Sequence, residues 1–254
     1  MNDDAIYKTW LADATDRFAG VVAASDLTRP VPSCPGWDVA ELVEHVVFIH
    51  AWVEKILATA AAQSAGDDHP APPRDAADAA LGYAHWYRQR AAAMRTAMDA
   101  YPPEAPCWNF SGVNMTYGFW PRRQTHEVSV HTVDASLTGG EELTIDPLVA
   151  ADGIDELLRV FGVRMAQRGA PADLTAHVTI VPSDIDRAWT VSPPQVNGGA
   201  VLVDDGANGD AAASLGGTAS DLLLALWKRL PADRLTVTGD AAVAAAYVGS
   251  RLVP

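Results

Sequence analysis

Several features that mark secreted, membrane-bound or disulfide-stabilised proteins are missing from this sequence. Only two cysteines, Cys34 and Cys107, occur among 254 residues, and neither belongs to a C-x-x-C motif. Two cysteines cannot form the disulfide framework of a secreted protein of this length. The first residues, MNDDAIYKTW, lack the apolar core of a signal peptide, and no apolar run reaches the length of a membrane span. We therefore expect a cytoplasmic protein.

Positive charge is also scarce. The chain has 18 Lys and Arg residues against 32 Asp and Glu residues, so its formal net charge is −14. This balance disfavours binding to nucleic acid and to anionic membrane surfaces, both of which attract basic proteins. The proportions of hydrophobic residues, 49%, and of charged residues, 20%, are typical of a globular protein with a sizeable core. The composition leaves a monomer and a homodimer equally open.

The first 140 residues carry the apolar periodicity of four long helices. We expect these helices at residues 4–24, 38–62, 75–100 and 121–137. The second begins with a clear signal, because Asp38 and Glu41 have the spacing of a capping box and Trp37 precedes them at the position of a hydrophobic staple. Residues 63–74, rich in small residues, Asp and Pro, form the expected linker. Four helices joined by loops predict an antiparallel four-helix bundle.

The pattern changes after residue 148. One more helix is expected at 149–168, followed by segments that are rich in β-formers: LTAHVTIVP, RAWTVS, AVLVDD, AAASLGG and LTVTGD. The segments TASDLLLALWKRL and AAVAAAYVGSRL have helical character. The whole chain is therefore predicted to be α+β. We place its domains at 1–148 and 149–254, with the fifth helix as the bridge.

The segment QTHEVSVHTVDA, residues 124–135, carries the strongest chemical signal. It resembles the zinc-protease motif H-E-x-x-H but has one residue too many between its histidines. His126 and His131 are five residues apart, which is about 140° around a helix of 3.6 residues per turn, so a regular helix cannot aim both at one ion. Glu127 and His131 are four apart and share a face. The pair to consider is therefore Glu127 with His131, and the glutamate would be a ligand rather than a general base.

A third ligand must come from another helix. His45 lies within the apolar stripe of the second helix, between Leu42 and Ile49, and so points toward the bundle axis, whereas His50 falls on another side. Helix bundles build metal sites from histidines and carboxylates on facing helices. Two histidines and one glutamate leave a position open on Zn²⁺, as catalytic zinc sites do. The plainer alternative is a hydrogen-bonded core histidine beside an ordinary Glu–His pair.

Two longer motifs are similar to those of the mycothiol-dependent maleylpyruvate isomerase family, which belongs to the DinB-like metal-binding bundles. VPSCPGWDVAELVEHV contains a Pro-Gly-Trp turn followed by L-x-x-H, and WPRRQTHEVSVHTVDA contains an arginine-rich helix start, H-E-x-x-x-H and Asp-Ala. The C-terminal GTASDLLLALWKRL and LTVTGD resemble the appended domain of that family, which is similar to the sterol-carrier fold. The resemblance covers nearly the whole chain and implies an actinobacterial source.

The resemblance implies a divalent metal, usually zinc, held by His45, Glu127 and His131. It also implies mycothiol as a cosubstrate that supplies the reacting thiol. That thiol could add to a double bond, allow rotation and leave, which is cis–trans isomerisation of a maleylpyruvate-like compound, or it could stay on an electrophile, which is S-transfer. Water in the open position would give hydrolysis. A non-catalytic metal-binding or regulatory protein on the same fold is the alternative. Arg88 and Arg123 are candidates for catalytic contact with substrate.

Other residues near these motifs have two interpretations each. Arg122 and Arg123 could bind a substrate carboxylate bidentately, or one of them could pair with a nearby acidic residue. Asp134, three residues after His131, could orient that histidine through its second ring nitrogen. Cys34 could act as a nucleophile or ligand, but the resemblance assigns the reacting thiol to the cosubstrate, and packing in a turn is the simpler interpretation.

Overall fold

The computed structural model describes residues 3–59 and 73–254. The chain divides into two compact units, Met1–Leu143 and Thr144–Pro254. The domain boundary that the sequence predicts after residue 148 stays a prediction. Within the described ranges, none of the helices combines the length and the apolar character that crossing a membrane would require.

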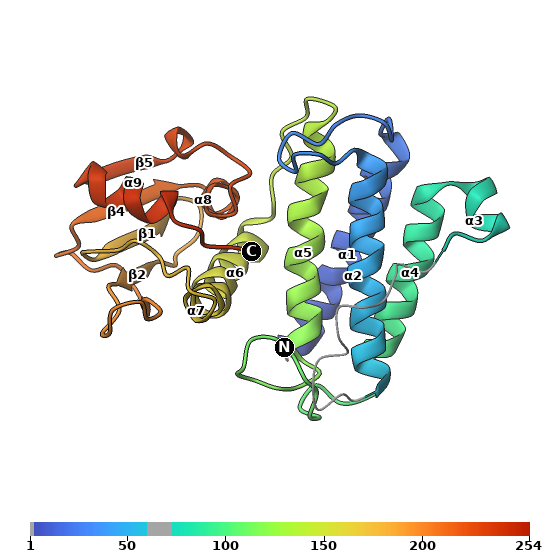
Figure 1. The fold of residues 1–254 in the computed structure, drawn as a ribbon, viewed down its shortest axis with the longest axis horizontal. Helices are drawn as coiled ribbons and strands as arrows, with labels where there is room; N and C mark the ends of the chain where they lie inside the picture. The colour runs from blue at the N-terminus through green and yellow to red at the C-terminus, as the bar shows by residue number, and fades with distance from the viewer. Residues whose placement is uncertain (1–2, 60–72) are drawn as a thin grey trace. The chain divides into compact units, whose positions relative to one another are not determined.

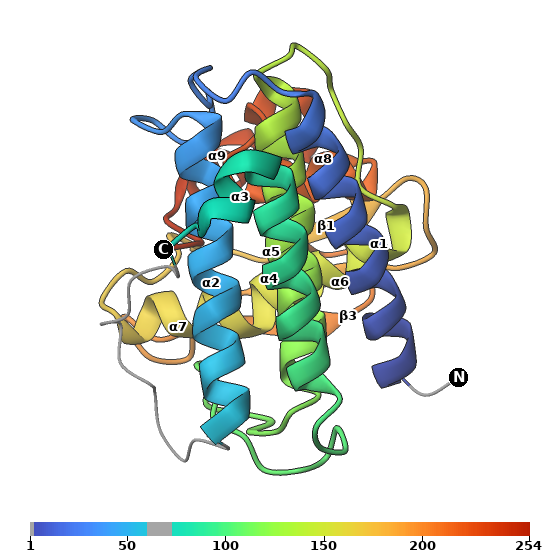
Figure 2. The same ribbon diagram turned by 90° about the vertical axis from the view of Figure 1, so that its right-hand side faces the viewer.

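The first unit is helical, and its four long helices lie side by side (Figures 1 and 2). Its helices are α1 (Asp3–Ala24), α2 (Val39–Thr59), α3 (Ala76–Leu81), α4 (Tyr83–Met98) and α5 (Phe119–Leu137). Helix α1 packs against α4 and α5, and α2 packs against the same two helices. The predicted bundle is therefore confirmed, although the expected end of the second helix near residue 62 and most of the linker 63–74 lie outside the described residues.

The single helix predicted at 75–100 is wrong, because the chain breaks it into α3 and α4. Gly82 separates them with a φ of 89°, a left-handed backbone angle that residues other than glycine rarely adopt. Helix α3 has its own capping box, in which the Asp78 amide donates to the Asp75 side chain at 2.8 Å. Gly82 carried no flanking proline or second glycine, so the apolar periodicity on both sides suggested one helix.

The bundle core consists of two clusters of buried side chains. One gathers residues of α1, α2, α4 and α5 around Phe18 and Tyr87, whose ring centroids lie 4.6 Å apart. The other surrounds Trp120, which is fully buried near the start of α5. Each buried apolar side chain of this size contributes about 1.5–3 kcal/mol to the free energy of folding. This packing joins α2 and α5, the two helices that carry the ligand candidates His45, Glu127 and His131.

The turn before α2 has the geometry that the sequence predicted. The Glu41 amide donates to the Asp38 side chain and the Asp38 amide donates to the Glu41 side chain, each at 2.9 Å, so the capping box is confirmed. Gly36 has a φ of 91°, which lets the chain turn back so that the Val31 amide reaches the Trp37 carbonyl at 2.8 Å. Trp37 packs against the first core cluster.

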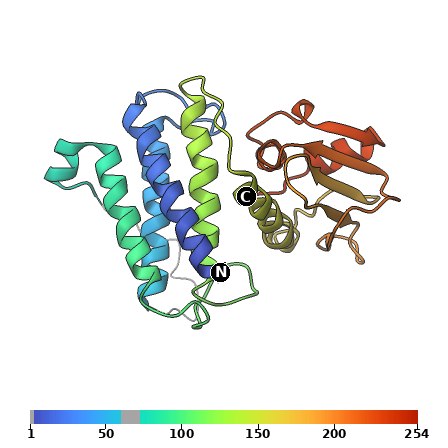
Figure 3. The same ribbon diagram turned by 180° about the vertical axis from the view of Figure 1, so that it is seen from behind.

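The second unit contains a five-stranded sheet in the order β3-β2-β1-β4-β5. Its strands are β1 (Val178–Pro182), β2 (Trp189–Ser192), β3 (Leu202–Asp205), β4 (Ala213–Gly217) and β5 (Thr236–Gly239). Only β1 and β4 pair in parallel, and the other neighbours are antiparallel. Each segment predicted as a strand forms one, and Figure 3 shows the sheet from behind.

The helices of the second unit accompany this sheet. They are α6 (Pro147–Glu156), a π-helical turn (Leu157–Phe161), α7 (Gly162–Gln167), α8 (Ala219–Leu226) and α9 (Ala241–Gly249), with a short 3₁₀ turn at Ala232–Arg234. Helix α8 contacts β1 and β4, α9 contacts β4 and β5, and α6 packs on α8. The predicted α+β class, a helical region followed by a small mixed-sheet domain, is confirmed.

Candidate metal centre

Helix α5 carries an unusual number of polar side chains into the interior of the first unit. Arg123, Gln124, His126, His131 and Asp134 are all at most 7% exposed. Buried polar groups are costly unless they find hydrogen-bond partners, so such a helix requires a network around it. That network surrounds the segment of α5 that the sequence singled out.

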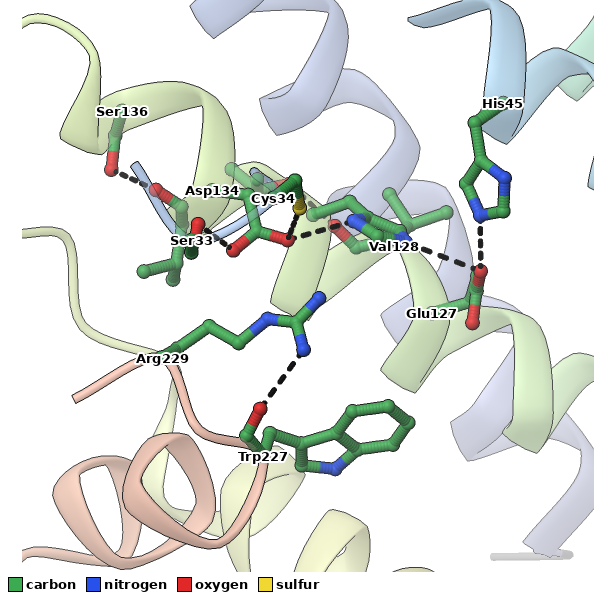
Figure 4. Close-up of polar contacts among 12 residues, drawn as sticks. Ser33, Cys34, His45, Glu127, Val128, Asp134, Ser136, Trp227 and Arg229 are labelled. Atoms are coloured by element: carbon green, nitrogen blue, oxygen red, sulfur yellow. Dashed lines mark hydrogen bonds and ion pairs between the residues drawn. The ribbon is translucent and has the colours of Figure 1, made fainter. Parts of the chain in front are cut away.

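The structure brings His45, Glu127 and His131 together, and Figure 4 shows the His45 ring beside the Glu127 carboxylate. The Glu127 Oε1 atom lies 3.5 Å from His45 Nε2 and 3.3 Å from His131 Nε2, and the three donor atoms are within 4.8 Å of one another. The imidazole rings of His45 and His131 meet edge to face, with centroids 5.1 Å apart. Histidines from two helices and a carboxylate from one thus converge on a common point.

The two distances from Glu127 Oε1 fit ligands around an ion better than partners in hydrogen bonds. Good N–H···O bonds have N–O distances of roughly 2.7–3.2 Å, shorter than either distance here. Donor atoms that share one tetrahedral zinc ion are separated by roughly 3.3–3.6 Å, given bonds of about 2.0–2.2 Å to the metal. The donor set of two imidazoles and one carboxylate also suits zinc. The residues therefore fit a divalent ion.

The other two histidines of this region have different surroundings. His50 is fully buried, with Nδ1 3.0 Å from Gln124 Oε1 and Nε2 3.4 Å from the Tyr87 hydroxyl. Burial lowers the pKa of His50 to about 4, so the ring is neutral. His126 is buried on α5 and is not among the donors that converge with Glu127. The helical-face argument, which paired Glu127 with His131 and turned His126 elsewhere, agrees with this arrangement.

Asp134 holds the second nitrogen of His131. Its Oδ2 atom lies 2.8 Å from His131 Nδ1, and its side chain is fully buried. The Ser33 hydroxyl donates to Asp134 Oδ1 at 2.5 Å and the Cys34 thiol donates to Oδ2 at 3.6 Å, as Figure 4 shows. The contact between Asp134 Oδ2 and His131 Nδ1 places a proton on Nδ1 and leaves Nε2 to act as a ligand. The interpretation of Asp134 as the residue that orients His131 thus has its hydrogen bond.

Arg123 has the acidic partner that one interpretation of the paired arginines expected. Its guanidinium Nη2 forms an ion pair with Glu127 Oε2, one turn further along α5. Burial alone would raise the pKa of Glu127, but the charge of Arg123 and the contacts with His131 and His45 hold that pKa well below its usual range. Arg122 instead lies over the Tyr7 ring, 6.0 Å from its centroid.

Arg88 lies on the exposed side of α4. Among the described residues, the hydrogen bonds and ion pairs of the three converging side chains do not involve it. A contact between Arg88 and substrate therefore stays a prediction without support from this geometry. Arg123 differs, because its guanidinium is already bound to the Glu127 carboxylate.

Cys34 takes part in a second group of potential ligand atoms, together with His131 and Asp134. The shortest contact in that group is the 2.8 Å hydrogen bond between the histidine and the aspartate, which is too short for two atoms that share a metal. Cys34 is therefore a hydrogen-bond donor to Asp134. Sequence reasoning missed Ser33 altogether, since it lies 101 positions before Asp134 and leaves no local spacing to detect.

Comparison with known families covers both units. Residues 10–136 match the mycothiol maleylpyruvate isomerase N-terminal domain, and residues 149–246 match the MDMPI C-terminal domain. The chain belongs to the mycothiol-dependent maleylpyruvate isomerase family. The family recognised from the Pro-Gly-Trp and H-E-x-x-x-H motifs is thus confirmed.

Two solved structures share the fold of this family member. One is a crystal structure of the mycothiol-dependent maleylpyruvate isomerase, with a TM-score of 0.62, 14% identity and 94% of each chain covered. The other is a variant of that enzyme in which a histidine is replaced by alanine, with a TM-score of 0.59, 13% identity and the same coverage. A comparison with curated protein sequences gave no match. At these identities the likeness concerns the fold alone.

Proposed function

We propose that this protein is a metal-dependent enzyme that uses mycothiol to convert a maleylpyruvate-like cis compound into its trans isomer. The observation that carries the proposal is the convergence of His45, Glu127 and His131 on one point between α2 and α5. Membership of the family in both units supports the thiol and the class of reaction. The motifs on which the resemblance to the family rests include all three of these side chains.

The metal in this proposal is a divalent ion, with zinc as the best fit. His45 Nε2, His131 Nε2 and Glu127 Oε1 would hold it, and three protein donors leave a coordination position for another molecule. An ion of this kind lowers the pKa of a thiol that binds it, so that the thiol is a nucleophile at neutral pH.

The residues around the three donors hold them in place. Asp134 keeps the Nδ1 proton of His131, and the Trp37 ring lies 4.8 Å from the His45 ring, which limits how that imidazole can turn. The His45 side chain is 29% exposed, compared with 15% for Glu127 and 9% for His131. A cosubstrate would therefore reach the site past His45, the most accessible of the three.

The proposed reaction consumes no thiol. The sulfur adds to one carbon of a cis double bond conjugated to a carbonyl group, and the electron pair moves onto the carbonyl oxygen. The former double bond is then single and rotates. Return of the electron pair expels the thiolate and leaves the trans double bond. In S-transfer, by contrast, the new carbon–sulfur bond persists and one thiol is consumed for each product molecule.

This difference defines the experiment. The purified protein would be assayed for zinc content, then incubated with mycothiol, glutathione or bacillithiol in the presence of maleylpyruvate or a generic electrophile. Isomerisation of maleylpyruvate with mycothiol unchanged supports the proposal. Stoichiometric loss of thiol into a stable conjugate would make the protein an S-transferase. Failure to bind zinc, together with no turnover, would favour a non-catalytic binding or regulatory protein.

A further inference from the structure

We propose that Arg123 is a positioning residue that makes Glu127 a ligand through one oxygen only. The inference rests on the proposed function, since it concerns the same metal site. Oε1 of Glu127 faces both His45 and His131, at 3.5 and 3.3 Å, while Oε2 is bound by the Arg123 guanidinium. The two oxygens of one carboxylate thus have different partners, and only Oε1 is directed at the point where the histidines converge.

The Arg123 contact is difficult to displace. Arg123 is 3% exposed, and its partner Glu127 lies on the next turn of the same helix. The helix therefore fixes the backbone positions of the two residues relative to each other. An ion that took both oxygens of Glu127 would have to strip the carboxylate from this buried guanidinium. Leaving a buried charge without its partner is strongly unfavourable. A single-oxygen bond to Glu127 avoids that cost.

Two consequences follow for the site. With Glu127 held to one oxygen, the protein supplies three donor atoms, and a four-coordinate ion retains a position for the thiol. In addition, the charge of Arg123 balances the charge of Glu127, so the positive charge of a divalent ion remains available to an anionic sulfur. Arg123 thereby prepares the site for a thiolate without itself touching the substrate, unlike the substrate contact expected from the sequence.

Cobalt provides the test, because Co²⁺ replaces zinc and its visible absorption weakens as coordination number rises from four to five. Cobalt-loaded wild type would be compared with Arg123→Met, which removes the partner of Oε2, and with Arg123→Lys, which retains a cation. Arg122→Gln is the matched control, since Arg122 is the neighbouring arginine on α5 and lies over Tyr7. Each protein would also be titrated with mycothiol to follow the sulfur-to-cobalt charge-transfer band.

The expected result has three parts. Wild type and Arg122→Gln show the intense four-coordinate spectrum and the charge-transfer band. Arg123→Met binds cobalt at least as tightly but loses visible intensity, because the second Glu127 oxygen joins the three protein donors and a water molecule as a fifth ligand. Its charge-transfer band weakens or disappears, because that oxygen competes with the sulfur. Arg123→Lys recovers part of both signals. A residue with a merely structural role would weaken cobalt binding without changing the spectrum of the cobalt that remains bound.

Two results would overturn this inference alone: a wild-type spectrum in Arg123→Met, or loss of cobalt from a folded Arg123→Met protein. If Arg123→Met does not fold, a crystal structure of the zinc-loaded wild type decides the matter. One Glu127 oxygen on zinc and the other on Arg123 supports the inference, and two oxygens on zinc overturn it. Wild type that binds neither metal would instead overturn the proposed function, and this inference with it.

Discussion

The Nδ1 atom of His131 lies 2.8 Å from the Oδ2 atom of Asp134, and the aspartate is fully buried. Burial by itself would lower the pKa of His131, but the contacts with Asp134 and Glu127 raise that pKa to about 9 in the metal-free protein. Asp134 is therefore the residue outside the donor set on which His131 depends most directly for its orientation.

Replacement of Asp134 by Asn should lower zinc affinity roughly 10- to 100-fold, the usual effect of losing a carboxylate behind a ligating histidine. Isothermal titration with zinc measures this. The matched control is Ser33→Ala, which removes one donor to Asp134 but leaves the His131 contact, and its affinity should fall less. Equal affinities for wild type and Asp134→Asn would contradict the orienting role.

Replacement of His131 by Ala should abolish zinc binding and thiol-dependent turnover together, because the site then has only two protein donors. His126→Ala should keep the metal, since His126 is a buried residue outside the donor set. Zinc per protein molecule, measured by mass spectrometry after gel filtration, distinguishes the two variants. If His126→Ala emptied the site and His131→Ala did not, the assignment of faces on α5 would be wrong.

Replacement of Cys34 by Ser should preserve both zinc content and turnover, because a serine hydroxyl can donate to Asp134 in place of the thiol. The measurement is the rate of mycothiol-dependent product formation at saturating zinc. Retention of zinc with complete loss of turnover would show that the thiol of Cys34 reacts, and would restore the nucleophile interpretation of this residue.

The buried His50 predicts how stability depends on pH. Its folded-state pKa is about 4, below its ordinary value of 6.5, so the folded protein cannot accept the proton that the unfolded chain binds. The contribution of His50 to the free energy of unfolding is therefore fully present above pH 6.5. It falls as pH drops toward 4, by about 2 kcal/mol at pH 5. Urea unfolding of the metal-free protein at pH 6.5 and pH 5 measures the difference.

The pH window between 6.5 and 4.5 isolates His50 from the two other shifted groups beside it. The stabilisation due to the raised pKa of His131 is complete below pH 6.5, and that due to the lowered pKa of Glu127 is lost only as pH falls below its ordinary value of 4.5. His50→Gln should therefore flatten the dependence between pH 6.5 and pH 5. An unchanged slope in this variant would assign the effect to other groups.

Features set by neighbours in the chain could be predicted from the sequence. Glu127 and His131 share a face because four residues make about one helical turn, and Asp134 is within reach of His131 because it is three residues further on. The capping box of Asp38 and Glu41 has the same local origin. Apolar periodicity likewise identified the long helices, and runs of β-formers identified the strands of the second unit.

Packing between distant segments decided the rest. His45 was expected to face the bundle axis, but only the packing of α2 against α5 brings its Nε2 atom to 3.5 Å from Glu127. Ser33 reaches Asp134 because the turn before α2 folds over α5, across 101 residues of sequence. The sequence left two interpretations of Arg123 open, and only the packing shows that it is buried beside Glu127, which supplies the counter-charge that a buried guanidinium requires. Helical spacing determines which side chains share a face, whereas burial and interhelical contact determine which of them meet.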